Sequence, residues 1–288
     1  MSHPAPAVSQ HEFVDLHTHS TASDGARTPA EVVAAAHAAK LAAFALTDHD
    51  TIGGLADASV AGARLGLRVI CGVELSAVEG DVETHILGLH LTELAELERR
   101  LSALREMRLT RARRIVERLH ELGIALSLDA VLQHAAGGAV GRPHVARAMI
   151  AAGFATDFRE AFERYLGNGK PAFVPKDKLP LAEAFGLIHR AGGLAVLAHP
   201  GQLGTKERIA ALAALGLDGI EILHPSHSWD DSQRLDALAG EFDLVRSGGS
   251  DWHGGQDGAR SLGMMRVPAK WLSDQDARVA ARGSRRVA

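Results

Sequence analysis

Residues 13–25 read FVDLHTHSTASDG, an apolar run that ends in two histidines one residue apart. Alternate side chains of a β-strand point to the same side, so His17 and His19 face one way and Thr18 faces the other. Packing alone does not explain two imidazoles that converge at the end of a strand. We therefore expect this segment to supply nitrogen ligands for a metal ion, and the loop of small residues after it to add Asp24.

Strand and helix patterns alternate through the first and last parts of the chain. The segment TPAEVVAAAHAAK (28–40) has a strong helix start, with Thr28 as N-cap, a proline in the first turn and Glu31 three residues after the cap. A strand pattern, LAAFALTDHD (41–50), follows directly. Repeated βα units of this kind predict an α/β fold with a mostly parallel sheet, here a TIM-like barrel.

The middle of the chain breaks this rhythm. It opens with LAELERRLSALREMRLTRARRIVERLHELG (94–123), which is helical in pattern, and little strand signal follows before residue 170. We therefore interpret the middle as a helical insertion that caps the substrate site. The expected organisation is a discontinuous barrel of residues 12–90 and 171–273, the insertion at 91–170, and tails at 1–11 and 274–288.

Composition excludes several classes of protein. The net charge of −4 gives no general attraction for nucleic acid. Cys71 is the only cysteine, so an intramolecular disulfide is impossible. The apolar stretches are too short for a membrane span, and the N-terminal segment lacks the apolar core of a secretory signal. We expect a cytoplasmic protein with no membrane partner.

Histidines and carboxylates recur where the predicted strands end. Parallel α/β barrels place their sites at this rim because every strand delivers its last residues there. Mixed nitrogen and oxygen ligation suits Mn, Fe or Zn, and a carboxylate such as Glu74 can bridge two ions. The groups, too many for one ion, are His17, His19, His49, Glu74, His85, His199, His224, Asp251 and His253.

A series of short motifs carries a resemblance to a known family. After the paired histidines come SDG, TDHD, GVELS, THILGL, LAHPG and SDWH. In combination they resemble the polymerase and histidinol phosphatase (PHP) family of metal-dependent phosphoesterases. The resemblance implies a distorted (β/α)7 barrel with three divalent ions, Mn foremost and Fe, Zn or Mg as alternatives.

The resemblance also assigns ligands by position. Some family members carry a histidine where this chain has Asp24, so the second site is richer in oxygen here. The implied sets are His17, His19, Glu74 and Asp251 for the first ion, Asp24, His49 and His253 for the second, and Glu74, His85 and His199 for the third.

Such a cluster suits hydrolysis of phosphate esters, because the ions lower the pKa of a bridging water and neutralise charge on the phosphoryl oxygens. Substrate selection must come from other residues. The segment GRPHVAR (141–147) offers Arg142 and His144 at a helix start, where an arginine can grip phosphate and assist catalysis. Lys170 lies in the glycine-rich segment YLGNGKPAFVP (165–175). His224 and His227 are candidates for contacting phosphate or protonating the leaving oxygen, His224 being favoured because it directly follows a strand.

The two basic segments resemble the nucleotide-acting branch of the family. That branch implies a phosphatase that removes the 3′-phosphate of 3′,5′-nucleoside bisphosphates and leaves the 5′-monophosphate, with small nucleotides as its partners. A 5′-to-3′ exoribonuclease acting on short RNA is the first alternative. A histidinol-phosphatase-like enzyme, a non-catalytic PHP module and an amidohydrolase on a similar barrel are the others.

Overall fold

The computed structural model describes residues 12–80, 82–135, 140–175, 179–255 and 260–287. The expected N-terminal tail at 1–11 lies outside the described residues. Within the part of the chain that the structure describes, no helix combines the length and the apolar character needed to cross a membrane.

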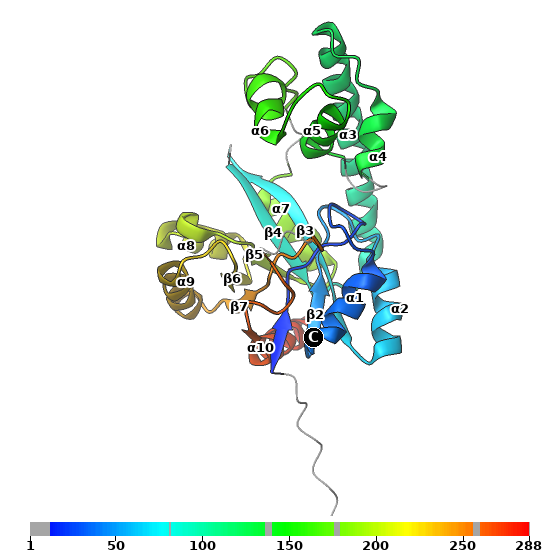
Figure 1. The fold of residues 1–288 in the computed structure, drawn as a ribbon. Helices are drawn as coiled ribbons and strands as arrows, with labels where there is room; N and C mark the ends of the chain where they lie inside the picture. Colours follow the sequence, from blue (N-terminus) through cyan, green and yellow to red (C-terminus); the bar gives the residue numbers. More distant parts are fainter. Residues whose placement is uncertain (1–11, 81, 136–139, 176–178, 256–259, 288) are drawn as a thin grey trace, which may run out of the picture.

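Eight strands form one sheet in the order β7-β6-β5-β4-β3-β2-β1-β8. The segments that follow β1 and β7 join each other and close the sheet into a barrel. The N–H of Leu16 donates to the carbonyl of Gly248 (3.0 Å), and the N–H of Asp251 donates to the carbonyl of His17 (2.9 Å). The expected distorted TIM-like barrel is confirmed (Figure 1). The strands are β1 (Phe13–Asp15), β2 (Ala43–Leu46), β3 (Arg68–Glu79), β4 (Val82–Leu89), β5 (Leu194–Leu197), β6 (Gly219–Leu223), β7 (Val245–Gly248) and β8 (Val267–Pro268).

The sheet departs from a regular βα barrel at two strands. β4 runs antiparallel to both β3 and β5, because β3 turns directly into β4 near Gly80 without an intervening helix. Gly80 has φ +62°, a left-handed conformation that glycine adopts readily. The two-residue β8 pairs antiparallel with β1 and adds a strand to the seven expected.

Helices pack around the barrel and cover one of its ends. The described part of the expected C-terminal tail, residues 274–287, is instead helical: α10 continues to Val287, contacts β7, β1 and β8, and buries Gln275 completely. This correction follows from the amphipathic spacing of α10, whose Leu272 joins the same buried cluster as Val14 and Leu16. The helices are α1 (Pro29–Ala38), α2 (Leu55–Leu65), α7 (Leu181–Arg190), the 3₁₀ turn η2 (Gly201–Leu203), α8 (Lys206–Leu215), α9 (Trp229–Glu241) and α10 (Ala269–Val287).

A separate helical lobe rises above the barrel (Figure 1). Its first helix joins both parts, since Leu97 and Leu101 pack into the barrel's core whereas Ile115 and Leu119 belong to a second core inside the lobe. The lobe therefore carries its own apolar core. It consists of α3 (Leu94–Glu121), α4 (Leu128–Ala135), α5 (Arg142–Ala151), α6 (Phe158–Ala161) and the π-helical turn η1 (Phe162–Leu166).

A candidate metal centre and the cavity beside it

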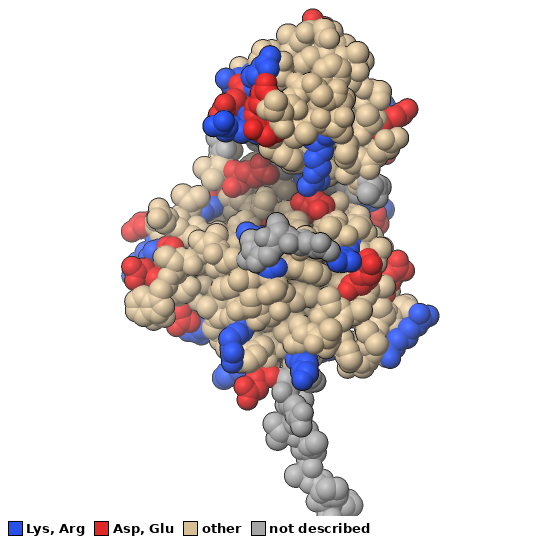
Figure 2. Space-filling view, in the orientation of Figure 1, with Lys and Arg blue, Asp and Glu red and all other residues tan. Residues whose placement is uncertain are grey.

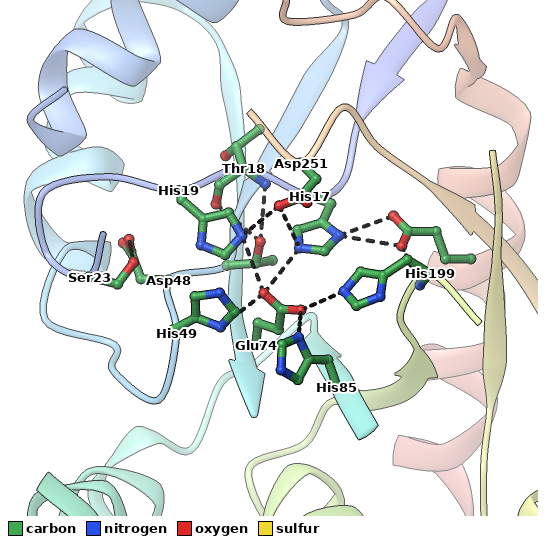
Figure 3. A network of polar contacts seen from close by, with 12 residues as sticks. His17, Thr18, His19, Ser23, Asp48, His49, Glu74, His85, His199 and Asp251 are labelled. Carbon is green, nitrogen blue, oxygen red and sulfur yellow. Dashed lines mark hydrogen bonds and ion pairs between the residues drawn. The ribbon is translucent and has the colours of Figure 1, made fainter. Parts of the chain in front are cut away.

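Glu74 lies at the centre of a cluster of imidazoles and is almost fully buried (Figure 3). Its Oε2 is 3.2 Å from Nε2 of His17, 3.3 Å from Nε2 of His19 and 3.1 Å from Nδ1 of His49. Its Oε1 faces two further histidines. The distances are 2.8 Å to Nδ1 of His85 and 3.1 Å to Nε2 of His199.

Two more carboxylates complete the cluster. Oδ1 of Asp251 lies 3.1 Å from Nε2 of His19 and 3.5 Å from Nε2 of His17. Oδ1 of Asp24 lies 3.3 Å from Nε2 of His253, and the other oxygen of Asp24 is 4.0 Å from Nε2 of His49. The structure thus brings together all the residues for which we expected metal binding.

The strands deliver these groups in two different ways. His17, His49 and His199 follow the ends of parallel strands, as expected. Glu74 and His85 instead lie within β3 and β4, so the expectation that they stand at strand ends is wrong. The long β3–β4 hairpin continues past the rim of the barrel, which brings its middle residues level with the ends of the shorter strands.

The local backbone is strained where two of these residues sit. His199 has φ +30° and Asp251 has φ +50°, both in the left-handed region that residues other than glycine rarely adopt. Such conformations persist only when the surrounding structure holds them, and they concentrate at functional sites. The strain is consistent with a site whose side-chain directions are fixed for a ligand.

Buried nitrogen atoms without hydrogen bonds test whether a metal ion fits. Among the described residues, both ring nitrogens of His19 and Nδ1 of His49 and His85 are buried and lack a hydrogen bond. Buried polar atoms are nearly always paired, so these four nitrogens, which lie beside carboxylates, fit a metal ion as their partner. The histidine and carboxylate donors suit a divalent ion, and the site fits metal ions.

The groups close enough to share an ion overlap with the expected sets without matching them. His199 belongs to none of the compact groups, although it touches Glu74, whereas His19 belongs to two. Potential ligand atoms lie within 4.8 Å of one another in four sets: His17, His19 and Asp251; His19, Asp24, His49 and His253; His49, Glu74 and His85; and His17, Glu221 and His224.

Electrostatics in the cluster favour a cation. Burial opposes every charged form here, yet the neighbouring histidines hold the pKa values of Glu74 and Asp251 below their usual range. Burial likewise lowers the pKa of His19, but the nearby carboxylates of Asp251 and Glu74 outweigh burial and raise the value to about 10. For His49 burial prevails and its pKa falls to about 4, so this ring is neutral and ready to bind metal.

Glu221 on β6 contacts two of the ligand candidates and was missed by the sequence reasoning. It is fully buried, its Oε1 lies 3.1 Å from Nδ1 of His17, and its Oε2 accepts the N–H of His199 at 2.7 Å. A carboxylate that fixes the outer nitrogen of a ligand histidine orients the ring and sets its tautomer. The available signal was a lone charge in the otherwise apolar strand GIEIL.

Other buried carboxylates hold the backbone of the site. Asp15 accepts the N–H groups of Ser250 and Gly263, both at 2.9 Å, and burial raises its pKa. Asp48 accepts the N–H and hydroxyl of Ser20, each at 2.7 Å, and thereby anchors the loop that carries Asp24. These contacts fix the loops from which the ligand candidates project.

His224 and His227 contact other protein groups and are not among the residues that line the cavity beside the metal cluster. Nε2 of His224 lies 3.4 Å from Oδ2 of Asp251, and its Nδ1 is 2.7 Å from Oγ of Ser226, so the ring stands behind Asp251. Nδ1 of His227 donates to the carbonyl of Ile222 (2.9 Å), and its Nε2 accepts the N–H of Gly201 (3.1 Å). Both nitrogens of His227 are thus used by the backbone, which is contrary to the expectation of a phosphate contact or proton donor.

A cavity of about 250 Å³ lies between the helical lobe and the metal cluster. Figure 2 shows the corresponding hollow between the lobe and the barrel. Arg142 and His144 line this cavity from the start of α5, and His49 and His85 line it from the barrel. Lys170 is exposed and is not among the lining residues, so the structure does not bring it to the cavity.

The arginine at the start of α5 is held rigidly. Its guanidinium lies over the rings of Phe162 and Phe173, and its Nη1 donates to the carbonyl of Leu166 at 3.1 Å. Nδ1 of His144 accepts the N–H of Gly141 at 3.0 Å, so a neutral ring carries its proton on Nε2. Both side chains are therefore pre-organised as donors to an anion.

Two further arginines, which the sequence reasoning missed, line the same cavity. Arg108 and Arg111 lie three residues apart on one face of α3. Arg108 pairs with Asp50, and Arg111 donates to the carbonyl of Val174 at 2.8 Å. Their spacing was visible in the sequence. The face that α3 turns toward the barrel was not.

Comparison with known proteins places the chain among metal-dependent phosphoesterases. A family model described as the PHP domain matches residues 15–168. The chain is 40% identical over 257 residues to the 3′,5′-nucleoside bisphosphate phosphatase of Chromobacterium violaceum, covering 87% of this chain and 90% of that protein. It is 37% identical over 247 residues to the 5′-3′ exoribonuclease Rnm of Escherichia coli, covering 83% and 84%.

Two solved structures share the fold. One, described as a metal-dependent phosphoesterase of Bifidobacterium adolescentis, is 30% identical with a TM-score of 0.82 and covers 93% of this chain and 96% of its own. The other, described as an amidohydrolase of Chromobacterium violaceum with bound sulfate and no metal, is 37% identical with a TM-score of 0.78 and covers 92% and 96%.

Proposed function

Because the chain belongs to the PHP family of metal-dependent phosphoesterases, we propose that it hydrolyses the 3′-phosphate of 3′,5′-nucleoside bisphosphates and releases nucleoside 5′-monophosphates. It is a hydrolase of phosphoester bonds, as its family is. One observation carries the choice of substrate: an arginine-lined cavity opens directly onto the cluster around Glu74. A relative named for this activity supports the choice.

The proposal assigns three divalent ions to the cluster, manganese being the first candidate. When bound, they lower the pKa of a water molecule and neutralise charge on the phosphoryl oxygens. Glu74 would serve more than one ion, because its two oxygens face five histidines. The residues that would hold the ions are His17, His19, Asp24, His49, Glu74, His85, His199, Asp251 and His253.

The cavity residues would hold the substrate's 5′-phosphate. Arg142, steadied by two aromatic rings, and His144, with its proton on Nε2, offer charge-assisted and neutral donors. Arg108 and Arg111 line the same cavity from α3, Arg111 adding positive charge while the charge of Arg108 is balanced by Asp50. Anchoring the 5′-phosphate in the lobe would place the 3′-phosphate over the metal cluster, so the lobe acts as the substrate cap.

His224 is assigned a supporting role in this proposal. Its Nε2 faces Oδ2 of Asp251, so it would orient that carboxylate from behind rather than protonate the leaving oxygen. Lys170 and His227 have no assigned role, because neither lies at the cavity wall. The non-catalytic alternative is disfavoured, since a binding module would have no need to gather so many ligand side chains.

The test is a comparison of substrates. Protein loaded with manganese is assayed with 3′,5′-adenosine bisphosphate, histidinol phosphate and a 5′-phosphorylated RNA pentamer. We expect a higher kcat/KM for 3′,5′-adenosine bisphosphate than for histidinol phosphate. The Glu74→Gln variant should be inactive on all three substrates. Preference for histidinol phosphate would overturn the assignment.

A further inference from the structure

Arg260 contacts Asp251, one of the expected metal ligands, and the proposed function gives this arginine no role. Its Nη1 donates to the backbone carbonyl of Asp251 at 2.9 Å and also forms an ion pair with Oδ2 of the same residue. Arg260 is not among the described residues that line the cavity under the lobe. The arginine is therefore placed to act on Asp251 and not on the 5′-phosphate.

The two carboxylate oxygens of Asp251 face different groups. Oδ1 lies 3.1 Å from Nε2 of His19 and 3.5 Å from Nε2 of His17, on the side of the metal cluster (Figure 3). Oδ2 faces Arg260 and, at 3.4 Å, Nε2 of His224. The imidazoles that could share an ion with Asp251 thus surround one oxygen, and the guanidinium lies on the other. Arg260 therefore does not take the place of the ion.

The backbone on both sides of this contact is fixed. Asp15 accepts the N–H groups of Ser250 and Gly263, both at 2.9 Å, so one buried carboxylate holds the chain just before Asp251 and just after Arg260. Asp251 itself has φ +50°, a left-handed conformation that persists only where neighbouring groups hold it. Its carbonyl is one of the groups that Arg260 binds. The contact is therefore part of the framework of the site.

The charge of Arg260 calls for an explanation, because a guanidinium stays protonated and repels divalent ions nearby. Its effect on Asp251 supplies one. A carboxylate can bind a cation through one oxygen or through both. With Oδ2 held by Arg260, only Oδ1 is turned toward the imidazoles, and the carboxylate cannot turn its second oxygen to an ion without breaking the ion pair.

We propose that Arg260 is a positioning residue, which holds Oδ2 of Asp251 so that this aspartate binds metal through Oδ1 alone. An ion held by one oxygen instead of two keeps one more position open, as metal sites in enzymes require. The inference rests on the proposed function, because it takes divalent ions to occupy the cluster. It deepens that function by giving a part to a residue outside both the ligand set and the described cavity wall.

The first test uses three variants. Arg260→Met removes the guanidinium, and Arg260→Lys keeps a positive donor. Arg266→Met is the matched control, since Arg266 belongs to the same segment but lies over the ring of Phe13 at 4.5 Å. On 3′,5′-adenosine bisphosphate we expect Arg260→Met to lower kcat about 10- to 100-fold with KM changed less than about threefold. Arg260→Lys should stay within about fivefold of wild type, and Arg266→Met within about twofold.

The second test measures the metal directly. Manganese retention against graded chelator should be at least equal to wild type in Arg260→Met, because the variant loses a repelling charge and frees a second ligand oxygen. Crystal structures grown with manganese should show Oδ1 of Asp251 alone on an ion in wild type, with Oδ2 on Arg260. In Arg260→Met both oxygens should contact the ion.

Several results would overturn the inference. They are a kcat for Arg260→Met close to wild type, an equal loss in Arg266→Met, a fall in manganese retention that parallels the fall in kcat, and one-oxygen binding that persists in Arg260→Met. The chelator series and the crystal structures need no substrate. A wild type that holds manganese but leaves the bisphosphate intact would therefore refute the proposed function, while these two measurements would still decide the role of Arg260.

Discussion

Glu221 and His17 meet at 3.1 Å, carboxylate to Nδ1, where both side chains are fully withdrawn from solvent. A carboxylate can only accept, so Nδ1 of His17 carries a proton and Nε2 is the nitrogen turned toward Glu74 and Asp251. Because the same carboxylate accepts the N–H of His199, one buried charge sets the position of two ligand candidates.

The first prediction concerns this contact. Glu221 accepts from Nδ1 of His17 and from the N–H of His199, and in Glu221→Gln an amide N–H would face one of these two donors. We therefore expect the affinity for metal to fall roughly 10- to 100-fold. Metal content after dialysis against graded chelator measures this without reference to activity. Glu241→Gln, at an exposed position at the end of α9, is the control, and equal metal retention in both variants would refute the positioning role of Glu221.

The second prediction separates two basic residues. Arg142→Ala removes a pre-organised cation from the cavity, and we expect KM for the bisphosphate to rise about 10- to 100-fold with metal content unchanged. Lys170→Ala should change KM less than about twofold, because Lys170 is exposed and outside the cavity wall. Steady-state kinetics decides, and a larger effect from Lys170 would reverse the assignment.

The third prediction concerns removal of the metal ions. Ions that bind only the folded chain stabilise it, by about 2.7 kcal/mol at a concentration 100 times Kd. For a chain of this size such a gain corresponds to a rise in Tm of roughly 4–5 °C. Thermal unfolding in manganese and in excess chelator measures the difference. The same Tm in both conditions would argue against a bound metal cluster.

The fourth prediction concerns His227. His227→Ala leaves the N–H of Gly201 without its partner and removes one of two donors to the carbonyl of Ile222, the other being the hydroxyl of Ser232, so we expect a loss of about 1–3 kcal/mol in the free energy of unfolding. The kcat of the folded protein should stay within about threefold of wild type. Chemical denaturation and kinetics on the same sample check both. A large fall in kcat without destabilisation would restore a catalytic role.

The sequence predicted much of the fold because its local signals agree with the final structure. The capping box at Thr28 and Glu31 is present at the start of α1. Alternate residues of β2 join different buried clusters, Ala43 and Ala45 in one, Phe44 and Leu46 in the other, as a period of two requires. The reversed β4 was missed because a hairpin strand has the same apolar pattern as a parallel one.

By itself, the sequence determined the barrel class and which side chains could bind metal, because strand periodicity and residue chemistry are local properties. Only the tertiary structure decided that Glu221 lies behind His17 and that Arg108 and Arg111 line the cavity. It also decided that His227 contacts the backbone and does not line the cavity. These contacts join residues far apart in the chain, and their geometry depends on how strands and helices pack. No local pattern encodes that packing.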